Sequence, residues 1–286
     1  MLDHRLHVFR PDLAEQRLEG QVAAERFVTG HRRVVVAPAT PLKEAPGADA
    51  PLGSELIRGE TVEVFEESPE GWSWVRNEAD GYVGYAATDA LGEPGRDPTH
   101  HVATLRTFVY PGPDMKLPAI GWLSLGSRLA FDGEAETRGT RFLLLANGEG
   151  AVVASHVLPL DAEPEPDFVA VAGRFLETPY LWGGRTSLGL DCSALVQVSL
   201  TAAGKACPRD TDMQEKMLGH LVVGGAEAGL ARGDLVFWTG HVGIMQDAVR
   251  MVHASGHHMR VVSEPLAGAV DRIARSGGWP TGVRRL

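Results

Sequence analysis

Cys192 is the residue of this chain best placed to act as a nucleophile. It follows a turn-rich loop, residues 183–189, and begins a segment whose apolar residues recur at roughly helical spacing up to a stop at Gly204. A sulfur at a helix start lies beside unpaired backbone N–H groups, which favour the nucleophilic thiolate over the thiol. The alternative is a buried, inert cysteine. The polar neighbours Asp191 and Ser193 argue against that alternative.

His241 and His253 are placed to supply a base and its partner. They lie in two apolar runs on either side of a polar turn around Asp247, which predicts a β-hairpin. If the turn is centred on Asp247, His241 faces His253 and Gly243 faces Met251, with directly opposed Cβ atoms ~4.5–5.5 Å apart. Two imidazoles this close can share a proton, one acting as a base and the other orienting it.

Two other interpretations of these histidines remain. One is a surface pair on an exposed sheet face. The other is a zinc site that also uses Cys192 and Cys207, but no CxxC or HxxxH spacing supports it, so we expect no metal. The segment GGRTSLG lacks the Lys-Ser/Thr of a phosphate-binding loop, so we expect no cofactor either.

The N-terminal part of the chain is expected to consist of a strut and two small barrels. Asp12 and Glu15 form a capping-box pattern, so residues 1–30 are predicted to be an N-terminal helical strut. Short alternating runs in residues 31–95, and again in residues 100–162, predict two β-barrels related as a divergent repeat. Both resemble bacterial SH3-like barrels, the first through LIRGETVEVFEE, GWSWVR and DGYVGY, the second through strand order and length.

Residues 165–286 form the domain that contains the candidate chemistry. A helix comes first, then the glycine-rich loop and the Cys192 helix, and the apolar strands DLVFW, HVGIMQ, RMVHA and RVVSE follow. Helices followed by strands predict an α+β domain.

Composition restricts the classes of function. The chain has 286 residues and a formal net charge of −10, which gives no electrostatic footprint for nucleic acid or an anionic membrane. Its two cysteines do not make a disulfide framework, and its first residues lack the apolar core of a secretory signal. We therefore expect a cytoplasmic monomer.

Five blocks of the last domain resemble the NlpC family of cell-wall cysteine peptidases. In chain order they are WGGRTSLGLDCSALV, PRDTDMQ, GDLVFW, HVGI and HAS. The resemblance implies a papain-like core with Cys192 as nucleophile, His241 as general base and then acid, and His253 as the orienting residue. The chain departs from the family at Ala194, where glycine is usual, and in the hairpin turn, residues 247–250.

The resemblance also implies a substrate. Family members with SH3-like barrels resemble enzymes that cut murein tri- or tetrapeptides after γ-D-glutamate, releasing L-Ala-γ-D-Glu from L-Lys or diaminopimelate during recycling. In this interpretation Tyr180 and the Cys192 N–H donate to the oxyanion, and Arg209 holds a substrate carboxylate. The free L-Ala amine would be bound by Asp191, Ser193, Thr211, Glu55 and Tyr82. The alternatives are an amidase or acyltransferase with the same site, or a wall-fragment binding protein without activity.

Overall fold

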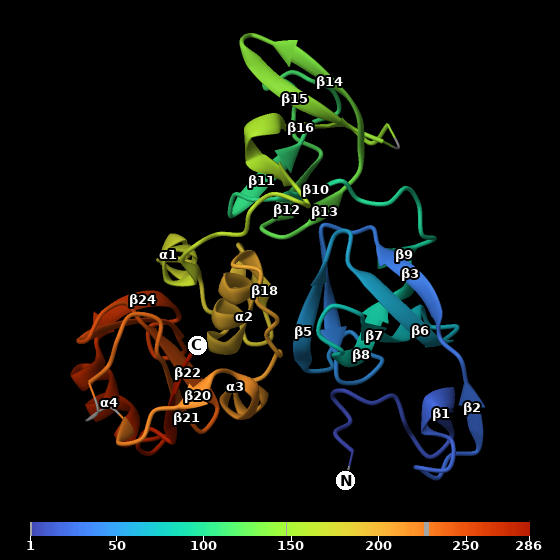
Figure 1. Cartoon of the computed structure of the whole chain (residues 1–286). Helices are drawn as coiled ribbons and strands as arrows, with labels where there is room; N and C mark the ends of the chain where they lie inside the picture. Colours follow the sequence, from blue (N-terminus) through green and yellow to red (C-terminus); the bar gives the residue numbers. More distant parts are fainter. Residues whose placement is uncertain (1, 147, 226–228) are drawn as a thin grey trace. The chain divides into compact units, whose positions relative to one another are not determined.

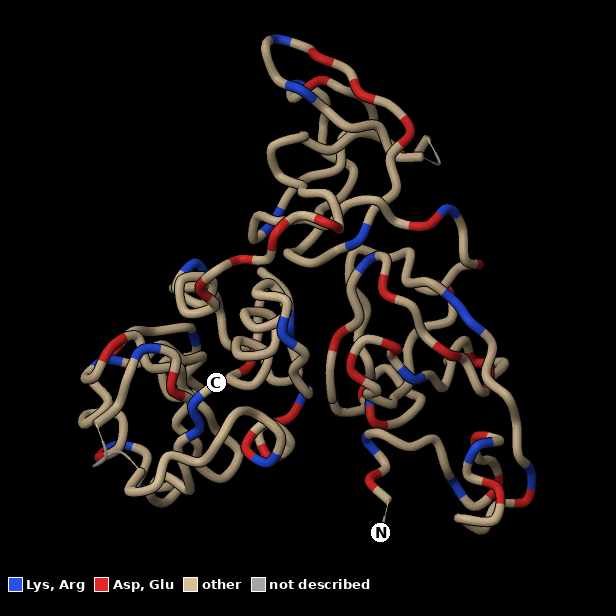
Figure 2. The backbone as a smooth tube through the Cα atoms, viewed as in Figure 1, with Lys and Arg blue, Asp and Glu red and all other residues tan. Residues whose placement is uncertain are grey.

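The chain forms two compact units, Met1–Ala162 and Glu163–Leu286. The computed structural model describes residues 2–146, 148–225 and 229–286 (Figure 1). Within these residues the α-helices all lie in the second unit, and the first unit is built from strands and 3₁₀ turns. Acidic and basic residues are interspersed along both units (Figure 2). The finer division of the first unit at the predicted boundaries stays a prediction.

The prediction of an N-terminal helix is wrong. The segment forms two short parallel strands and a 3₁₀ turn: β1 (Leu13–Glu15), η1 (Gln16–Leu18) and β2 (Arg26–Val28). The Glu15 carboxylate accepts hydrogen bonds from Arg17 and Arg76 instead of capping a helix. The Leu13 side chain is buried against Trp74 of the sheet that follows. These tertiary contacts outweigh the local capping pattern.

The next segment forms an antiparallel seven-stranded sheet with the order β5-β4-β8-β7-β6-β3-β9. The predicted alternation holds in β6, where Val62 and Val64 are fully buried and Glu63 between them is not. The strands are β3 (His31–Val35), β4 (Ala39–Lys43), β5 (Leu52–Ile57), β6 (Thr61–Glu67), β7 (Trp72–Asn77), β8 (Val83–Ala87) and β9 (Leu91–Gly92), with η2 (Thr88–Ala90) before β9.

The remainder of the first unit is a set of small antiparallel sheets around their own core. Val102, Leu123, Leu145 and Val152 are among the residues buried there. The sheets are β13-β10-β17, β11-β12 and β14-β15-β16. Their elements are β10 (His100–Val102), β11 (Arg106–Val109), β12 (Gly121–Ser124), β13 (Arg128–Leu129), β14 (Phe131–Thr137), β15 (Thr140–Leu145), β16 (Ala151–Val153), η3 (Ala154–His156) and β17 (Val157–Pro159).

The second unit is an α+β domain built on a six-stranded antiparallel sheet, as the order of its elements predicts. The strand order is β20-β25-β21-β22-β23-β24. The strands are β20 (His220–Leu221), β21 (Leu235–Trp238), β22 (His241–Met245), β23 (Arg250–Ser255), β24 (Arg260–Pro265) and β25 (Gly282–Arg285). A short hairpin of β18 (Arg185–Thr186) and β19 (Gly189–Leu190) precedes the Cys192 helix.

Four described helices accompany this sheet. They are α1 (Phe168–Arg174), α2 (Cys192–Ala202), α3 (Thr211–Met217) and α4 (Leu266–Ala274). Helix α2 packs against β22 and β23. Leu266 and Ala269 of α4 pack with Met245 and Met251 of the sheet. Among the described residues, no helix combines the length and the apolar composition that a membrane span requires.

Candidate active site

Helix α2 begins at Cys192 because Asp191 caps it. The Asp191 backbone is extended, and its carboxylate accepts hydrogen bonds from the N–H of Ala194 (2.8 Å) and the N–H of Gly183 (2.9 Å). The loop before it needs glycine, since a Cβ at Gly184 would lie 2.7 Å from a backbone carbonyl oxygen. The cap and the tight loop together fix where α2 begins, and they therefore fix the position of the Cys192 thiol.

The Cys192 thiol lies against the start of β22. It donates to the carbonyl oxygen of Gly240 (Sγ–O 3.8 Å), and its side chain is 6% exposed. Burial raises the pKa of this thiol to about 12 and the charge of Asp191 adds to the increase, whereas the N–H of Val242 acts in the opposite direction. The helix start acts in the predicted direction, since the N–H of Ser193 in the first turn of α2 lowers this pKa, but burial outweighs it and the resting thiol keeps its proton. A helix terminus contributes roughly 0.3–1 kcal/mol, and full burial shifts a pKa by up to about 3–5 units.

The two histidines meet as expected, because Nε2 of His241 and Nδ1 of His253 are 2.7 Å apart. His253 is 1% exposed, and His241 is partly buried beside the ring of Trp238. Burial lowers the pKa of His241 to about 3, and the neighbouring His253 ring and the charge of Arg272 lower it further. The resting site therefore combines a neutral thiol with a neutral imidazole.

The predicted register of the hairpin is wrong by two residues. Met251 of β23 pairs with Met245 of β22 rather than with the predicted Gly243. The turn is displaced because the Asp247 carboxylate accepts the N–H groups of Val249 and Arg250. A shift of two keeps every side chain on its predicted face, since side chains alternate with a period of two.

Gly243 lets the histidines meet in this shifted register. A Cβ at Gly243 would lie 3.5 Å from the Cβ of His253, so these residues face one another and His241 reaches His253 diagonally. Diagonal neighbours on a sheet face lie ~7–8 Å apart between Cα atoms, within reach of aromatic rings. The missing side chain at Gly243 leaves the space that the diagonal contact uses.

Glu264 and Arg272 extend the histidine pair, and the sequence analysis missed both. Oε1 of Glu264 lies 2.7 Å from Nε2 of His253, and Arg272 donates to both oxygens of the same carboxylate. The only signal in the sequence was the glutamate that ends the run RVVSE, and its partner depends on the register of β23 with β24. Among the described residues, no group of three or more His, Cys, Asp or Glu side chains is arranged to hold a metal ion.

Tyr180 shares the region of the thiol. Burial raises the pKa of its hydroxyl, and the negative charge of Asp191 raises it further, whereas the charge of Arg209 acts in the opposite direction. Its backbone N–H donates to the carbonyl of Met259, which ties the loop before α2 to the turn before β24. The hydroxyl therefore stays protonated at neutral pH, the form that can donate a hydrogen bond.

Asp191, Ser193 and Arg209 form a buried cluster under the start of α2. Arg209 is 1% exposed and places its two terminal nitrogens on the two Asp191 oxygens, at 3.0 and 2.6 Å. The same guanidinium donates to the Ser193 hydroxyl at 2.8 Å. This geometry gives Arg209 a structural role, and its predicted contact with a substrate carboxylate stays a prediction. For Asp191 and Ser193, contact with the substrate amine stays a prediction.

The remaining predicted binding residues lie in both units. Thr211 is the partly buried first residue of α3, and Gln214 of the same helix donates to the Ser193 carbonyl at 2.9 Å. In the first unit, Glu55 lies on β5, and Tyr82 is buried close to Gly53 of the same strand. A role of Thr211, Glu55 and Tyr82 in binding stays a prediction.

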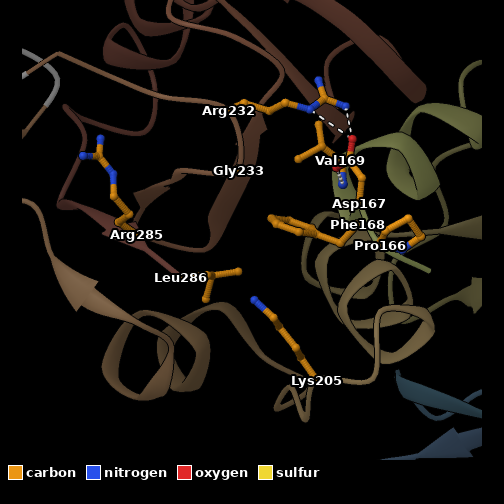
Figure 3. Close-up of a pocket in the computed structure, with 9 residues that line it drawn as sticks. All are labelled: Pro166, Asp167, Phe168, Val169, Lys205, Arg232, Gly233, Arg285 and Leu286. Atoms are coloured by element: carbon orange, nitrogen blue, oxygen red, sulfur yellow. Dashed lines mark hydrogen bonds and ion pairs between the residues drawn. The ribbon is translucent and has the colours of Figure 1, made fainter. Parts of the chain in front are cut away.

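A separate cavity of about 350 Å³ lies beside the start of α1 (Figure 3). Its basic residues include Arg232, which pairs with Asp167 at 2.6 Å, and Arg285, which pairs with Asp234 at 2.6 Å. Its lining does not include Cys192 or the histidines. The candidate catalytic residues therefore lie elsewhere in the second unit, outside this cavity.

Two protein-family models match the chain. The model of the NlpC/P60 family matches residues 177–272, which include Cys192, the two histidines, Glu264 and Arg272. The model of the bacterial dipeptidyl-peptidase SH3 domain matches residues 42–91, which lie within the seven-stranded sheet of the first unit.

Two curated proteins match most of the chain. Dipeptidyl-peptidase 6 of Lysinibacillus sphaericus is 30% identical over 239 residues, covering 78% of this chain and 87% of that protein. Gamma-D-glutamyl-L-lysine dipeptidyl-peptidase of Bacillus subtilis (strain 168) is 25% identical over 225 residues, covering 72% of this chain and 73% of that protein.

Solved structures show a similar fold. An NlpC/P60 family protein from Bacillus cereus ATCC 10987 superposes with a TM-score of 0.71 at 18% identity, covering 89% of this chain and 99% of that one. An NlpC/P60 endopeptidase from Photobacterium damselae subsp. piscicida gives a TM-score of 0.60 at 16% identity, covering 89% and 71%. At these identities the likeness concerns the fold alone.

Proposed function

Because the chain belongs to the NlpC/P60 family of cysteine peptidases, we propose that it hydrolyses murein peptides after γ-D-glutamate. The substrate carries a free N-terminal L-Ala, and the products are L-Ala-γ-D-Glu and a fragment that begins with L-Lys or diaminopimelate. The observation that carries the proposal is the Cys192 thiol at the start of α2, set against the strand whose His241 is bonded to His253. The name of the Bacillus subtilis relative supports the choice of bond.

In the proposed reaction His241 takes the thiol proton as the sulfur attacks the amide carbonyl. Both groups are neutral at rest, so the proton moves during the attack and not before it. When the tetrahedral intermediate collapses, the C–N bond breaks and His241 returns the proton to the leaving amine. A water molecule, deprotonated by His241, then releases the acyl group and restores the thiol.

The oxyanion of the intermediate is held by two donors in this proposal. The Cys192 N–H lies in the first turn of α2, where backbone N–H groups have no intrahelical acceptor. The Tyr180 hydroxyl is protonated and electrostatically coupled to the thiol. The loss of one such donor lowers kcat by roughly 10²–10³-fold in other enzymes, so we expect a loss of that order for Tyr180→Phe.

The two parts of the first unit are proposed to be SH3-like barrels that confer selectivity for the free amine. The match of residues 42–91 to the SH3 domain of bacterial dipeptidyl-peptidases supports this assignment for the first barrel. Glu55 and Tyr82, with Thr211 of the second unit, are the residues we assign to the L-Ala ammonium group. A carboxylate and hydroxyl groups are the partners that a desolvated ammonium requires.

The test compares two peptides that differ only at the amine. The chain is incubated with L-Ala-γ-D-Glu-L-Lys and with its N-acetylated form, and the products are separated by chromatography. We expect L-Ala-γ-D-Glu from the free peptide and at least about 100-fold slower cleavage of the acetylated one, because an uncompensated buried polar group costs several kcal/mol. Cys192→Ala should release no product from either peptide.

Each other result contradicts a defined part of the proposal. Equal cleavage of the two peptides would contradict selectivity for the free amine, and release of L-Ala would contradict the choice of bond. Transfer of the acyl group to added glycinamide, in preference to water, would identify an acyltransferase. A wild-type protein that cleaves neither peptide would contradict the peptidase assignment for these substrates.

We also propose that the reaction takes place in the cytoplasm, on imported wall fragments. A cysteine nucleophile stays reduced in that compartment. Cell fractionation with an antibody to the chain tests this part by itself, and detection solely in the envelope or the medium would contradict it.

A further inference from the structure

We propose that Glu264 is a positioning residue of the active site, which sets the proton on His253 and, through it, the basic nitrogen of His241. The carboxylate would act on the tautomer of each ring, and Arg272 would keep its charge balanced. This inference rests on the proposed cysteine-peptidase function and concerns how its base is prepared.

Three neighbouring strands present His241, His253 and Glu264 in a diagonal line across one face of the sheet. His253 of β23 is paired with Val262 of β24, so Glu264, two residues further along, is its diagonal neighbour on the same face. The Nε2 of His253 lies 2.7 Å from Glu264, and its Nδ1 lies 2.7 Å from His241. Both ring nitrogens of His253 are therefore used.

The ionised carboxylate of Glu264 determines which atom donates and which accepts in each hydrogen bond of this line. Burial raises the pKa of Glu264, but hydrogen bonds from His253 and Arg272 outweigh it, so its pKa lies well below the usual range. An ionised carboxylate can only accept, so Nε2 of His253 carries a proton. In neutral His253 the Nδ1 then accepts, and Nε2 of His241 must donate to it. This leaves the lone pair of His241 on Nδ1, as the base.

Arg272 decides how strongly the carboxylate attracts protons. It extends from α4 and donates to Oε2 at 2.8 Å and to Oε1 at 2.5 Å, and its side chain is 23% exposed. The charge of Glu264 favours an imidazolium at His241, and the charge of Arg272 opposes it. The pair therefore orients His253 while its two charges act in opposite directions on the protonation of His241.

The other charged and titratable groups around this line are few among the described residues. His258, in the turn before β24, is coupled to Glu264, Arg272 and His253. At the thiol end, Cys192 is coupled to Asp191 and Arg209. Neither set includes a second carboxylate bonded to the histidines. When Glu264 is removed, none of these groups should therefore take over its hydrogen bond with His253.

The test compares Glu264→Gln and Arg272→Met with a matched control, Asp234→Asn. Asp234 is fully buried where Glu264 is partly buried, and its carboxylate accepts two hydrogen bonds from Arg285, at 2.7 and 2.6 Å. The control thus removes a similar acid–arginine pair of the same unit without contact to a histidine. Thermal unfolding of all three variants corrects for any loss of folded protein.

In steady-state kinetics we expect Glu264→Gln to lower kcat by about 10- to 100-fold with little change in KM, because the tautomer of His253 is no longer fixed. The acidic limb of the kcat/KM profile should move to lower pH in Glu264→Gln and to higher pH in Arg272→Met. Asp234→Asn should leave the limb in place. Shifts of the same sign in both variants, or no shift in either, would refute the inference.

Two readouts need no peptide substrate, so they remain valid if the proposed substrate is wrong. In ¹⁵N–¹H spectra of histidine-labelled protein, His253, assigned with His253→Asn, should carry its proton on Nε2 in the wild type and lose that preference in Glu264→Gln. A wild-type His253 protonated on Nδ1 alone would overturn the inference. Alkylation of Cys192 by iodoacetamide should slow in Glu264→Gln and not in Asp234→Asn, and equal slowing in both would count against Glu264.

Discussion

At the scale of single residues, the resting site is neutral. The Cys192 thiol holds its proton because it is buried. His241 is uncharged because it loses solvation beside a second histidine and because the charge of Arg272 opposes its protonation. Neither pKa could be predicted from the sequence, because both shifts arise from burial and not from neighbours along the chain. The residue types were predictable, but their protonation was not.

The depressed pKa of His241 predicts how stability depends on pH. Between about 3, its pKa in the folded protein, and 6.5, its ordinary value, the unfolded chain binds a proton that the folded protein does not. The free energy of unfolding should therefore fall as the pH decreases through this window, by about 1–3 kcal/mol between pH 7 and pH 4. Urea unfolding at both pH values measures the fall.

His241→Asn is the matched variant for this measurement. It removes the titrating ring, so its stability should fall less with pH than that of the wild type. Carboxylates such as Glu264 remain in both proteins, which isolates the contribution of His241. The same pH dependence in both proteins would show that His241 is not the buried neutral base described here.

At the scale of elements, the site depends on where three strands and two helices place single side chains. Alternation on either side of Asp247 was enough to place His241 and His253 on one face. The register was not predictable, because the Asp247 carboxylate displaces the turn through bonds to the backbone. Glu264 was missed for a related reason, since its place diagonal to His253 depends on how β23 pairs with β24.

Gly243 should be intolerant of a side chain. A Cβ there would lie 2.6 Å from Sδ of the buried Met251, which would have to move, and 3.5 Å from the Cβ of His253, an ordinary contact. We expect Gly243→Ala to lower the free energy of unfolding by about 1–3 kcal/mol and to reduce kcat by filling the space that the diagonal contact between the histidines uses. Gly268→Ala in α4 is the control: no atom lies within 4 Å of its added Cβ, and alanine should stabilise the helix by up to about 1 kcal/mol. Wild-type kcat in Gly243→Ala would contradict this account.

The Asp191–Arg209 pair should be strongly coupled. Arg209 is buried, so Asp191→Asn or Arg209→Met leaves one partner uncompensated and should cost about 3–5 kcal/mol of stability each. The double variant should lose clearly less than the sum. Glu134→Gln, which breaks the exposed pair with Arg141, should change stability little. Additive losses in the double-mutant cycle would mean that the two side chains do not act as a pair.

At the scale of the whole molecule, the order of elements predicted the architecture better than any local signal. Helices before strands indicated the α+β domain, and the short alternating strands of residues 31–95 form a single antiparallel sheet. The N-terminal segment was misassigned because Leu13 and Glu15 are fixed by Trp74 and Arg76, more than fifty residues away in the chain. Such contacts cannot be read from a capping pattern.

Selectivity for the amine should depend on the first unit if both units contribute to binding. Glu55→Ala and Tyr82→Phe are expected to raise KM for L-Ala-γ-D-Glu-L-Lys by about 10-fold, the effect of one lost polar interaction of about 1.4 kcal/mol. Alkylation of Cys192 should keep its wild-type rate, because the thiol and both histidines lie in the second unit. An unchanged KM in both variants would contradict a role of the first unit in substrate recognition.

The protonated, buried state of Cys192 also bears on chemical damage. Peroxide oxidises thiolates much faster than thiols, and the sulfinic and sulfonic products are irreversible. A nucleophile that keeps its proton at rest and gives it up during the attack is therefore oxidised slowly during oxidative stress. We expect the resting protein to keep its activity through a peroxide exposure that inactivates peptidases with a permanent thiolate.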